Sequence, residues 1–332
     1  PLLRHPGMVF HPPLLFLGYA GFGLPACAAL AHAVTDAPGR WILSMRNWTL
    51  LAWVFLTVGI ILGAWWSYME LGWGGYWAWD PVENASLIPW LTGTAFLHTA
   101  VIEQRTGALK RSNVALIVGT YILCLFGTYI VRTGVVQSLH AFGDSGLGLP
   151  LLLAMGGLAL FVPVSLWGGI RSKQNVPKAS SRAGVMSLGV WLLIALSVII
   201  LVGTMWPVFS SLWSQQTIGL GPAFFNRVCP PLFALLPWMF AVAPFRGWRG
   251  GFRDTRGMAI ALAGGILAIG MAVVSGVRLP IVLLALGGSG SCLVAAGYCV
   301  LRYPQVRRSR HQWGMYLAHA ALALMVIGVA LS

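Results

Sequence analysis

Charged residues are scarce in this chain: they make up 8% of its 332 residues, and only seven of them are acidic. A water-soluble domain of this length needs more solvated groups on its surface, so the composition excludes one. The alternation of apolar and polar residues that is typical of membrane strands is also lacking, because the apolar stretches are continuous. The sequence therefore predicts an all-α, polytopic membrane protein.

The apolar residues, 58% of the total, gather into ten runs, and a helix of about 20 apolar residues crosses a bilayer. The runs cover 12–34, 48–68, 86–102, 114–131, 147–167, 186–206, 228–243, 258–276, 280–300 and 313–331. The seventh is short and interrupted by prolines. We expect about ten transmembrane helices, with about four in a core formed by residues 1–145. The remainder, in 146–332, end in the span that carries His319.

The net charge of +14 is a topology signal rather than a sign of nucleic-acid binding. If the chain before Pro12 lies outside, the five inner loops hold 17 cations: Arg40, Arg46, Arg105, Lys110, Arg111, Arg171, Lys173, Lys178, Arg182, Arg246, Arg249, Arg253, Arg256, Arg302, Arg307, Arg308 and Arg310. The outer segments hold four: Arg4, Arg132, Arg227 and Arg278. This asymmetry agrees with the positive-inside rule and fixes the orientation of the spans.

The five cysteines include no C-x-x-C pair, so the chain has neither a thiol redox motif nor a covalent haem-attachment motif. Isolated cysteines in apolar runs usually fill space. The chain opens on a proline with no initiator methionine and no signal-peptide pattern, and we expect it to be part of a longer protein.

The segment 65–85 lies on the outer side and is rich in aromatic residues and glycine. Its aromatic members are Trp65, Trp66, Tyr68, Trp73, Tyr76, Trp77 and Trp79, and it contains three glycines. Trp and Tyr often anchor helix ends at headgroup depth, which accounts for one or two tryptophans per end. A dense run interleaved with glycines instead favours a platform for a planar ligand, because indoles offer broad rigid faces and glycine allows close backbone approach.

Four of the seven histidines stand out by position, although a single histidine is ordinarily a packed side chain. His11 and His140 share the outer side with the Trp-rich segment and could supply both axial ligands of a haem iron. His98 and His319 lie inside apolar runs at similar distances, about 6 and 9 Å, from the inner side. They could hold one iron between helices, with His32 as a rival.

Three charged residues near the outer side have two interpretations each. Arg132 could pair with a haem propionate or extend to the interface as an arginine at a helix end. Asp80 and Glu83 could act as general acid and base, or could hydrogen-bond the loop and cap the span that begins near Ser86.

The motif Trp73-Gly-Gly-Tyr-Trp77-Ala-Trp79-Asp80 resembles the WWD signature of haem-handling proteins of the CcmC, CcsA and CcmF types. The continuation Pro81-Val-Glu-Asn-Ala-Ser86 is similar to the CcmF branch, the cytochrome c haem lyase subunit. The resemblance is close over residues 1–145 and returns at Leu317-Ala-His319-Ala. It also includes Phe10-His11-Pro12-Pro13, Phe96-Leu-His98, Val131-Arg132 and Ser138-x-His140-Ala-Phe142.

This resemblance implies a bacterial inner-membrane protein whose WWD segment faces the periplasm. His11 and His140 would hold the substrate haem, and His98 and His319 would hold a resident haem b. Implied partners are a CcmE-type haem chaperone, a CcmH-type thiol protein and apocytochrome c, whose CXXCH motif receives the haem. Thioether formation favours ferrous haem, so the inner haem could pass an electron outward. Members of the family are about twice as long as this chain.

Two other functions compete with the lyase. A haem exporter or chaperone-loading protein of the CcmC or CcsA type would share the platform and the outer histidines but form no covalent bond. The Pro-Val-Glu-Asn run and the His98/His319 pair favour the lyase over it. A transporter for an unrelated solute would need broken helices and polar residues near the middle of the membrane, and the sequence offers little of either.

Overall fold

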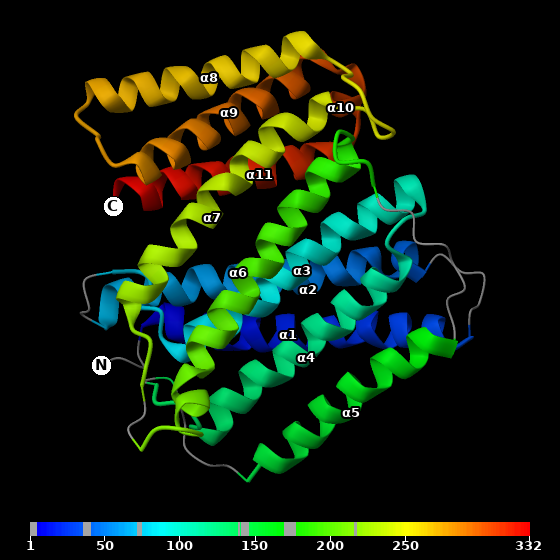
Figure 1. Cartoon of the computed structure of the whole chain (residues 1–332), viewed down its shortest axis with the longest axis vertical. Helices are drawn as coiled ribbons and strands as arrows, with labels where there is room; N and C mark the ends of the chain where they lie inside the picture. Colours follow the sequence, from blue (N-terminus) through cyan, green and yellow to red (C-terminus); the bar gives the residue numbers. More distant parts are fainter. Residues whose placement is uncertain are drawn as a thin grey trace. The chain divides into compact units, whose positions relative to one another are not determined.

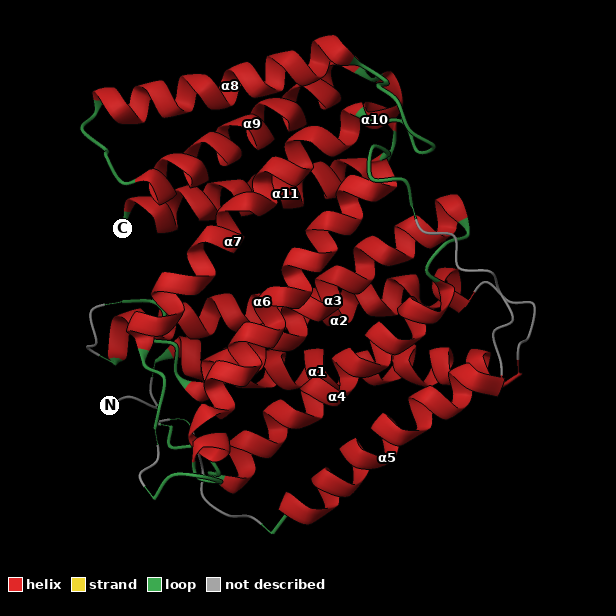
Figure 2. Ribbon diagram, in the orientation of Figure 1, coloured by secondary structure: helices red, strands yellow, loops and turns green. Residues whose placement is uncertain are grey.

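The structure, a computed structural model, describes residues 5–35, 41–71, 75–138, 140, 146–168, 177–215 and 218–332. The predicted all-α class is confirmed, since these residues form helices joined by loops (Figures 1 and 2). The elements are α1 (Pro6–Thr35), α2 (Trp41–Glu70), α3 (Pro81–Thr106), α4 (Lys110–Thr133), α5 (Gly148–Gly168), α6 (Arg182–Ser210), α7 (Pro222–Val242), η2 (Ala243–Phe245), α8 (Thr255–Val274), α9 (Pro280–Arg302), α10 (Pro304–Arg308) and α11 (Arg310–Leu331).

Among the described residues, nine helices are long and apolar enough to cross a membrane, so the chain is a multi-pass membrane protein. They match nine of the ten predicted runs. The remaining run, 147–167, coincides with α5, whose described apolar part is the shorter stretch Gly148–Pro163. Most of the helices begin before the predicted runs: α1 begins at Pro6 rather than near Pro12, and α2 begins at Trp41 rather than near Trp48. His11 therefore lies within α1. Apolar runs mark the lipid-buried part of a span, whereas the helix continues past it.

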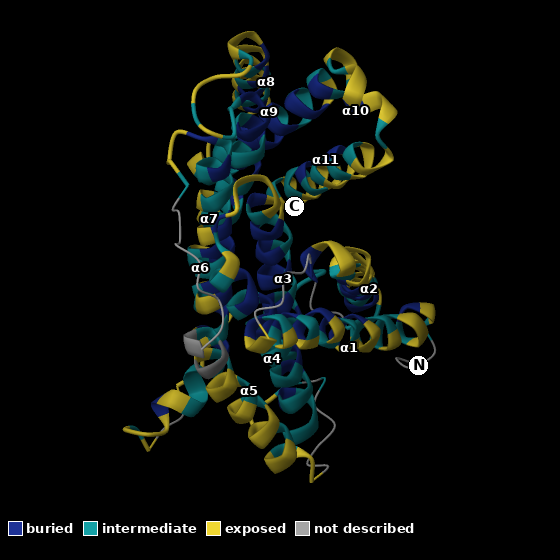
Figure 3. Cartoon of the chain, turned by 90° about the vertical axis from the view of Figure 1, so that its right-hand side faces the viewer, coloured by how far each residue is buried: buried dark blue, intermediate teal, exposed yellow. Residues whose placement is uncertain are grey.

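The chain divides into two compact units, which are described separately. The first comprises residues 1–175 and 193–225, and so contains the predicted 1–145 core and continues beyond it. Within it α1 packs most extensively on α2, α3 packs on α4, and α4 also contacts α1 and α5. Of the candidate spans α3 is the most buried (Figure 3). This unit carries the cleft described below.

Small residues allow α1 and α2 to approach closely. A Cβ atom added to Gly18 would lie 2.8 Å from the Cβ of Leu56, and one added to Gly21 would lie 2.8 Å from the Cβ of Ala52. Gly18 faces Leu56 and Gly21 faces Ala52, so residue numbers rise along α1 as they fall along α2, and the two helices are antiparallel. Without a hydrophobic drive between helices in lipid, such close packing supplies much of the association energy. It also sets His11 opposite the end of α2.

The second unit comprises residues 176–192 and 226–332. In it α9 packs against α8 on one side and α11 on the other. Asp254 is the N-cap of α8: its Oδ1 accepts a hydrogen bond from the backbone N–H of Gly257 at 2.8 Å. Its Oδ2 accepts from the hydroxyls of Tyr303 at 2.8 Å and Tyr298 at 3.1 Å, so one carboxylate joins the start of α8 to the end of α9.

Candidate functional site

A cleft opens in the first unit where the start of α1, the end of α2 and the start of α3 meet the segment that follows α4. It is lined by His11, Leu15, Ile60, Gly63, Ala64, Trp66, Trp77, Val82, Glu83, Ser86 and His140. The cleft encloses about 40 Å³, room for a few water molecules. The structure thus brings His11 and His140 together with two of the tryptophans, Trp66 and Trp77.

His11 is held in the cleft by α2. Its imidazole stacks on the indole of Trp66, with ring centroids 6.2 Å apart and planes 14° apart. A Cβ atom added to Gly63 would lie 2.8 Å from the Nδ1 of His11, so the ring occupies space that only glycine leaves open. This Nδ1 is buried and makes no hydrogen bond of ordinary length and angle within the described part of the chain.

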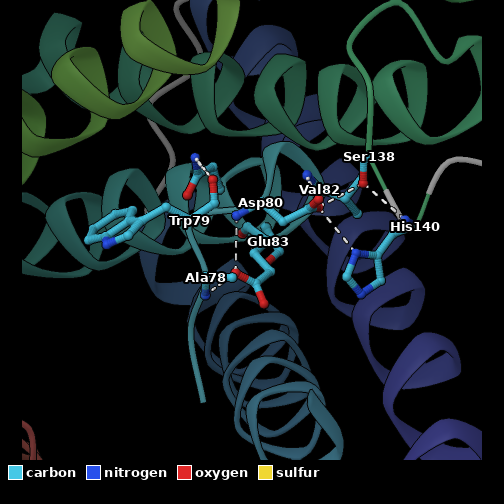
Figure 4. Close-up of polar contacts among 9 residues, drawn as sticks. Ala78, Trp79, Asp80, Val82, Glu83, Ser138 and His140 are labelled. Carbon is cyan, nitrogen blue, oxygen red and sulfur yellow. Dashed lines mark hydrogen bonds and ion pairs between the residues drawn. The ribbon is translucent and has the colours of Figure 1, made fainter. Parts of the chain in front are cut away.

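His140 reaches the cleft from the segment that follows α4. Its Nδ1 lies 3.1 Å from the Oδ1 of Asp80, and its backbone N–H donates to the Oγ of Ser138 at 3.0 Å (Figure 4). The hydroxyl of Ser138 in turn donates to the same Asp80 oxygen at 2.7 Å. The edge of the His140 ring meets Trp66, with centroids 5.8 Å apart. Both outer histidines therefore contact one indole, which is itself only 5% exposed.

Asp80 and Glu83 form the capping box of α3, which confirms the capping interpretation and moves the start of the span to Pro81. The Oδ1 of Asp80 accepts from the backbone N–H of Val82 at 2.9 Å. The Oε2 of Glu83 accepts from the backbone N–H groups of Ala78 at 2.9 Å and Asp80 at 3.2 Å. Burial raises the pKa of the Asp80 carboxyl, but the hydrogen bonds from His140, Ser138 and Val82 together lower it below its usual value.

Trp79 is the last residue before the cap, and its backbone is in the left-handed region at φ 58°. For a bulky side chain this conformation is an outlier and needs support from its surroundings. The indole stacks on Phe225 with centroids 5.0 Å apart and planes 13° apart. The amide of Asn84 donates to the Trp79 carbonyl at 3.1 Å and to the hydroxyl of Thr204 at 3.0 Å. Trp79 thus fixes the turn that directs Asp80 toward His140.

The predicted platform is only partly brought together. Trp65 and Trp66 are neighbours on a helix and point about 100° apart; Trp65 is 45% exposed and meets His5 at 4.7 Å instead of lining the cleft. Tyr76, Trp79 and Arg132 do not line the cleft either. Arg132 lies in the last turn of α4, where a helix dipole favours a cation. Trp73 and Phe142 lie outside the described residues.

His98 and His319 have the same local arrangement in different units. The Nδ1 of His98 lies 2.8 Å from the carbonyl of Thr94, and that of His319 lies 2.8 Å from the carbonyl of Met315. A carbonyl only accepts, so each Nδ1 carries the proton and each Nε2 carries the lone pair that a metal ligand needs. His98 is eight residues before the end of α3, and His319 is nine residues after the start of α11. Their pairing across one iron stays a prediction.

Sequence reasoning missed three contributors to the site. Gly63 makes room for the His11 ring, Ser138 bridges Asp80 and His140, and Phe225 supports Trp79 from a position more than 140 residues away along the chain. Of these only Ser138 lay in a motif that drew attention. Contacts between residues distant in sequence leave no periodicity or spacing to detect, so nothing in the pattern pointed to the other two.

The geometry defines a helical membrane protein with a cleft between two histidines that share a tryptophan. The family profile "Cytochrome C assembly protein" matches residues 1–137 of the chain. The cytochrome c-type biogenesis protein CcmF of Haemophilus influenzae is 35% identical over 352 residues, covering 100% of this chain and 54% of the relative. The biogenesis protein CycK of Bradyrhizobium diazoefficiens is 38% identical over 362 residues, covering 99% and 53%.

A solved structure of "Cytochrome c Heme Lyase CcmF" is similar with a TM-score of 0.82 and 32% identity, and the match covers 98% of this chain and 51% of that one. The chain belongs to the CcmF family of cytochrome c assembly proteins. It spans about half the length of the curated relatives it matches.

Proposed function

We propose that this chain forms the haem-holding part of a cytochrome c haem lyase in a bacterial inner membrane, with its cleft facing the periplasm. The single observation that carries the proposal is the cleft in which His11 and His140 both meet Trp66. Two imidazoles are common axial ligands of a haem iron, and the buried indole that both imidazoles contact holds them at one cleft.

The substrate haem is held at the mouth of the cleft. A porphyrin is larger than the 40 Å³ that the cleft encloses, so most of the ring extends outward past Trp66 and Trp77. In this arrangement the vinyl groups remain accessible to an incoming peptide. Arg132, at the end of α4, is assigned to a haem propionate, which a guanidinium can bind through two parallel hydrogen bonds.

The bond-forming step requires no nucleophile from this chain. Each cysteine thiol of the CXXCH motif adds across one vinyl group: an S–H bond and a vinyl π bond break, and a C–S and a C–H bond form. No electrons are gained or lost overall. The contribution of the chain is positioning, which can lower the barrier of a reaction between two bound partners by several kcal/mol, about 7–11 in favourable cases. One axial histidine then yields to the substrate histidine.

His98 and His319 are assigned to a resident haem b, which when bound supplies one-electron transfer that keeps the substrate haem ferrous. What the chain itself provides is the fixed tautomer at both residues. The hydroxyl of Thr94 also accepts from the indole N–H of Trp53 at 2.8 Å, which anchors the turn that holds His98. Around His319, the ring of Phe240 stacks with its centroid 4.1 Å away.

Expected partners are a CcmE-type haem chaperone, a CcmH-type thiol protein and apocytochrome c, together with the surrounding lipid. The alternative remains a haem exporter or chaperone-loading protein. Both functions use the cleft, but only the lyase needs the apocytochrome as a substrate.

The two functions separate in one reconstitution. Membranes of a bacterium without its own haem lyase would carry this chain, the remaining half of a relative, the chaperone, the thiol protein and a reporter apocytochrome c. Haem that stays on the reporter in a denaturing gel, and is lost with His140→Ala, supports the lyase. Haem that accumulates on the chaperone with none on the reporter contradicts the lyase and supports the loader.

A further inference from the structure

Asp80 and His140 are joined across 60 residues by a compact polar network. The carboxylate oxygen Oδ1 of Asp80 accepts from the backbone N–H of Val82, the hydroxyl of Ser138 and, at 3.1 Å, the Nδ1 of His140 (Figure 4). The side chains of Asp80 and His140 are only 9% and 18% exposed. Shielding from solvent strengthens a hydrogen bond to a charged group.

A carboxylate oxygen can only accept, so this contact places the proton on Nδ1 of His140. The lone pair of the ring is then on Nε2. Histidines that bind metals commonly donate their other N–H to a carboxylate in this way, which fixes the tautomer and raises the basicity of the ligand.

The carboxylate is itself held rigidly. Asp80 is the N-cap of α3 and its backbone N–H donates to Glu83, while the left-handed turn at Trp79 is supported by Asn84. Glu83 also lines the cleft, but its described bonds go to backbone N–H groups of the cap and not to His140. The two acids of the motif therefore have different tasks.

We propose that Asp80 is a positioning residue that sets the ring tautomer and orientation of His140, so that Nε2 of His140 is the nitrogen offered to a haem iron. The inference about iron rests on the function proposed above, whereas the tautomer is a property of the chain alone. Helix capping and ligand orientation are thus combined in one carboxylate.

The test uses the full chain, haem-free and labelled with ¹⁵N-histidine, in detergent micelles. His140→Ala assigns the signal of His140. We expect the wild type to show the Nδ1–H tautomer at His140, and Asp80→Asn to shift it toward Nε2–H, because an amide NH₂ can donate to Nδ1. An Asp-to-Asn change beside a catalytic histidine has this effect in serine proteases, where the geometry stays intact. Asparagine caps a helix about as well as aspartate, so the fold is retained.

Two matched variants complete the experiment. Asp254→Asn changes the N-cap of α8 in the other unit and leaves the His140 signal unchanged. Ser138→Ala keeps the carboxylate and leaves the tautomer unchanged. A wild type with Nε2–H, an Asp80→Asn variant that keeps Nδ1–H, or a Ser138→Ala shift as large as that of Asp80→Asn would each overturn the proposal.

Haem titration of the same proteins separates this inference from the function on which it rests. Asp80→Asn is expected to weaken haem binding at the cleft by roughly 10- to 100-fold, as the loss of an outer-shell partner of a metal ligand typically does. If His140→Ala leaves haem binding unchanged, the cleft is not the haem site and the proposed function fails, whatever the tautomer shows. If His140→Ala abolishes binding and Asp80→Asn does not weaken it, only the positioning role fails.

Discussion

Gly63 lies so close to His11 that a Cβ atom added to Gly63 would sit 2.8 Å from the Nδ1 of His11. Real Cβ atoms do not approach other atoms so closely, so Gly63→Ala must displace the imidazole. The variant is expected to reduce haem binding at the cleft although residue 63 offers no ligand. Gly119→Ala is the control, since a Cβ atom there meets nothing within 4 Å. Haem titration followed by absorbance would measure both, and equal affinities would contradict the placement of His11.

The packing of α1 on α2 predicts a stability effect. A Cβ atom on Gly18 would lie 2.8 Å from the backbone N and the Cβ of Leu56. Gly18→Ala is expected to lower the free energy of unfolding by roughly 1–3 kcal/mol, the usual cost of overpacking. Gly297→Ala on α9, where a Cβ atom meets nothing within 4 Å, should be neutral or stabilising by up to about 1 kcal/mol. Thermal unfolding in detergent would compare the two, and similar midpoints would rule out the close approach.

Close contacts such as these could not be predicted from the sequence, whereas the spans and the helix cap could. Apolar runs locate the spans because lipid demands about 20 apolar residues, and Asp80 with Glu83 predicts a helix cap because the motif is local. The runs misplace the start of α1, since a helix extends beyond the lipid-buried part. Which of Trp65 and Trp66 is buried depends on the rotation of α2 about its axis, which the sequence does not give. The hydrogen bond from His140 to Asp80 depends on a fold that brings distant segments together.

The charge on Asp254 predicts that the stability of the second unit depends on pH. The hydrogen bond from Gly257 lowers the pKa of this carboxyl below its ordinary 3.8; burial opposes the shift, and the hydroxyls of Tyr303 and Tyr298 add to it. A lowered pKa contributes stability above pH 3.8, and that stability is lost as the pH falls through the folded value. Asp254→Asn, which keeps a capping residue, should therefore unfold more easily than wild type at pH 7, with the difference shrinking toward pH 3.

Unfolding midpoints of both proteins between pH 7 and pH 3 would check this. A difference that grows as the pH falls would contradict the direction of the shift. Tyr303→Phe removes one of the two phenol donors to Asp254. In the Tyr303→Phe background, the stability difference at pH 7 between the proteins with and without Asp254→Asn should be smaller but still present.

The proposed haem b site predicts a spectral change. His98→Ala should remove the haem b bands from reduced-minus-oxidised spectra of the purified chain while leaving helix content unchanged, because a half-buried imidazole is lost without disturbing the packing of α3. His319→Ala should do the same if both residues hold one iron. His32→Ala is the matched control near the inner end of α1. A haem b spectrum that survives His98→Ala but not His32→Ala would reassign the site.

The proposed function requires His11 and His140 together to hold a haem at the cleft. The most direct measurement is haem titration of the purified full chain carrying His98→Ala, so that only the cleft can bind, with His11→Ala, His140→Ala and His5→Ala each added in turn. We expect a six-coordinate, low-spin spectrum that is lost with His11→Ala and with His140→Ala. It should be retained with His5→Ala, because the imidazole of His5 meets the exposed Trp65. A low-spin spectrum unchanged by His11→Ala and by His140→Ala would contradict the proposed function.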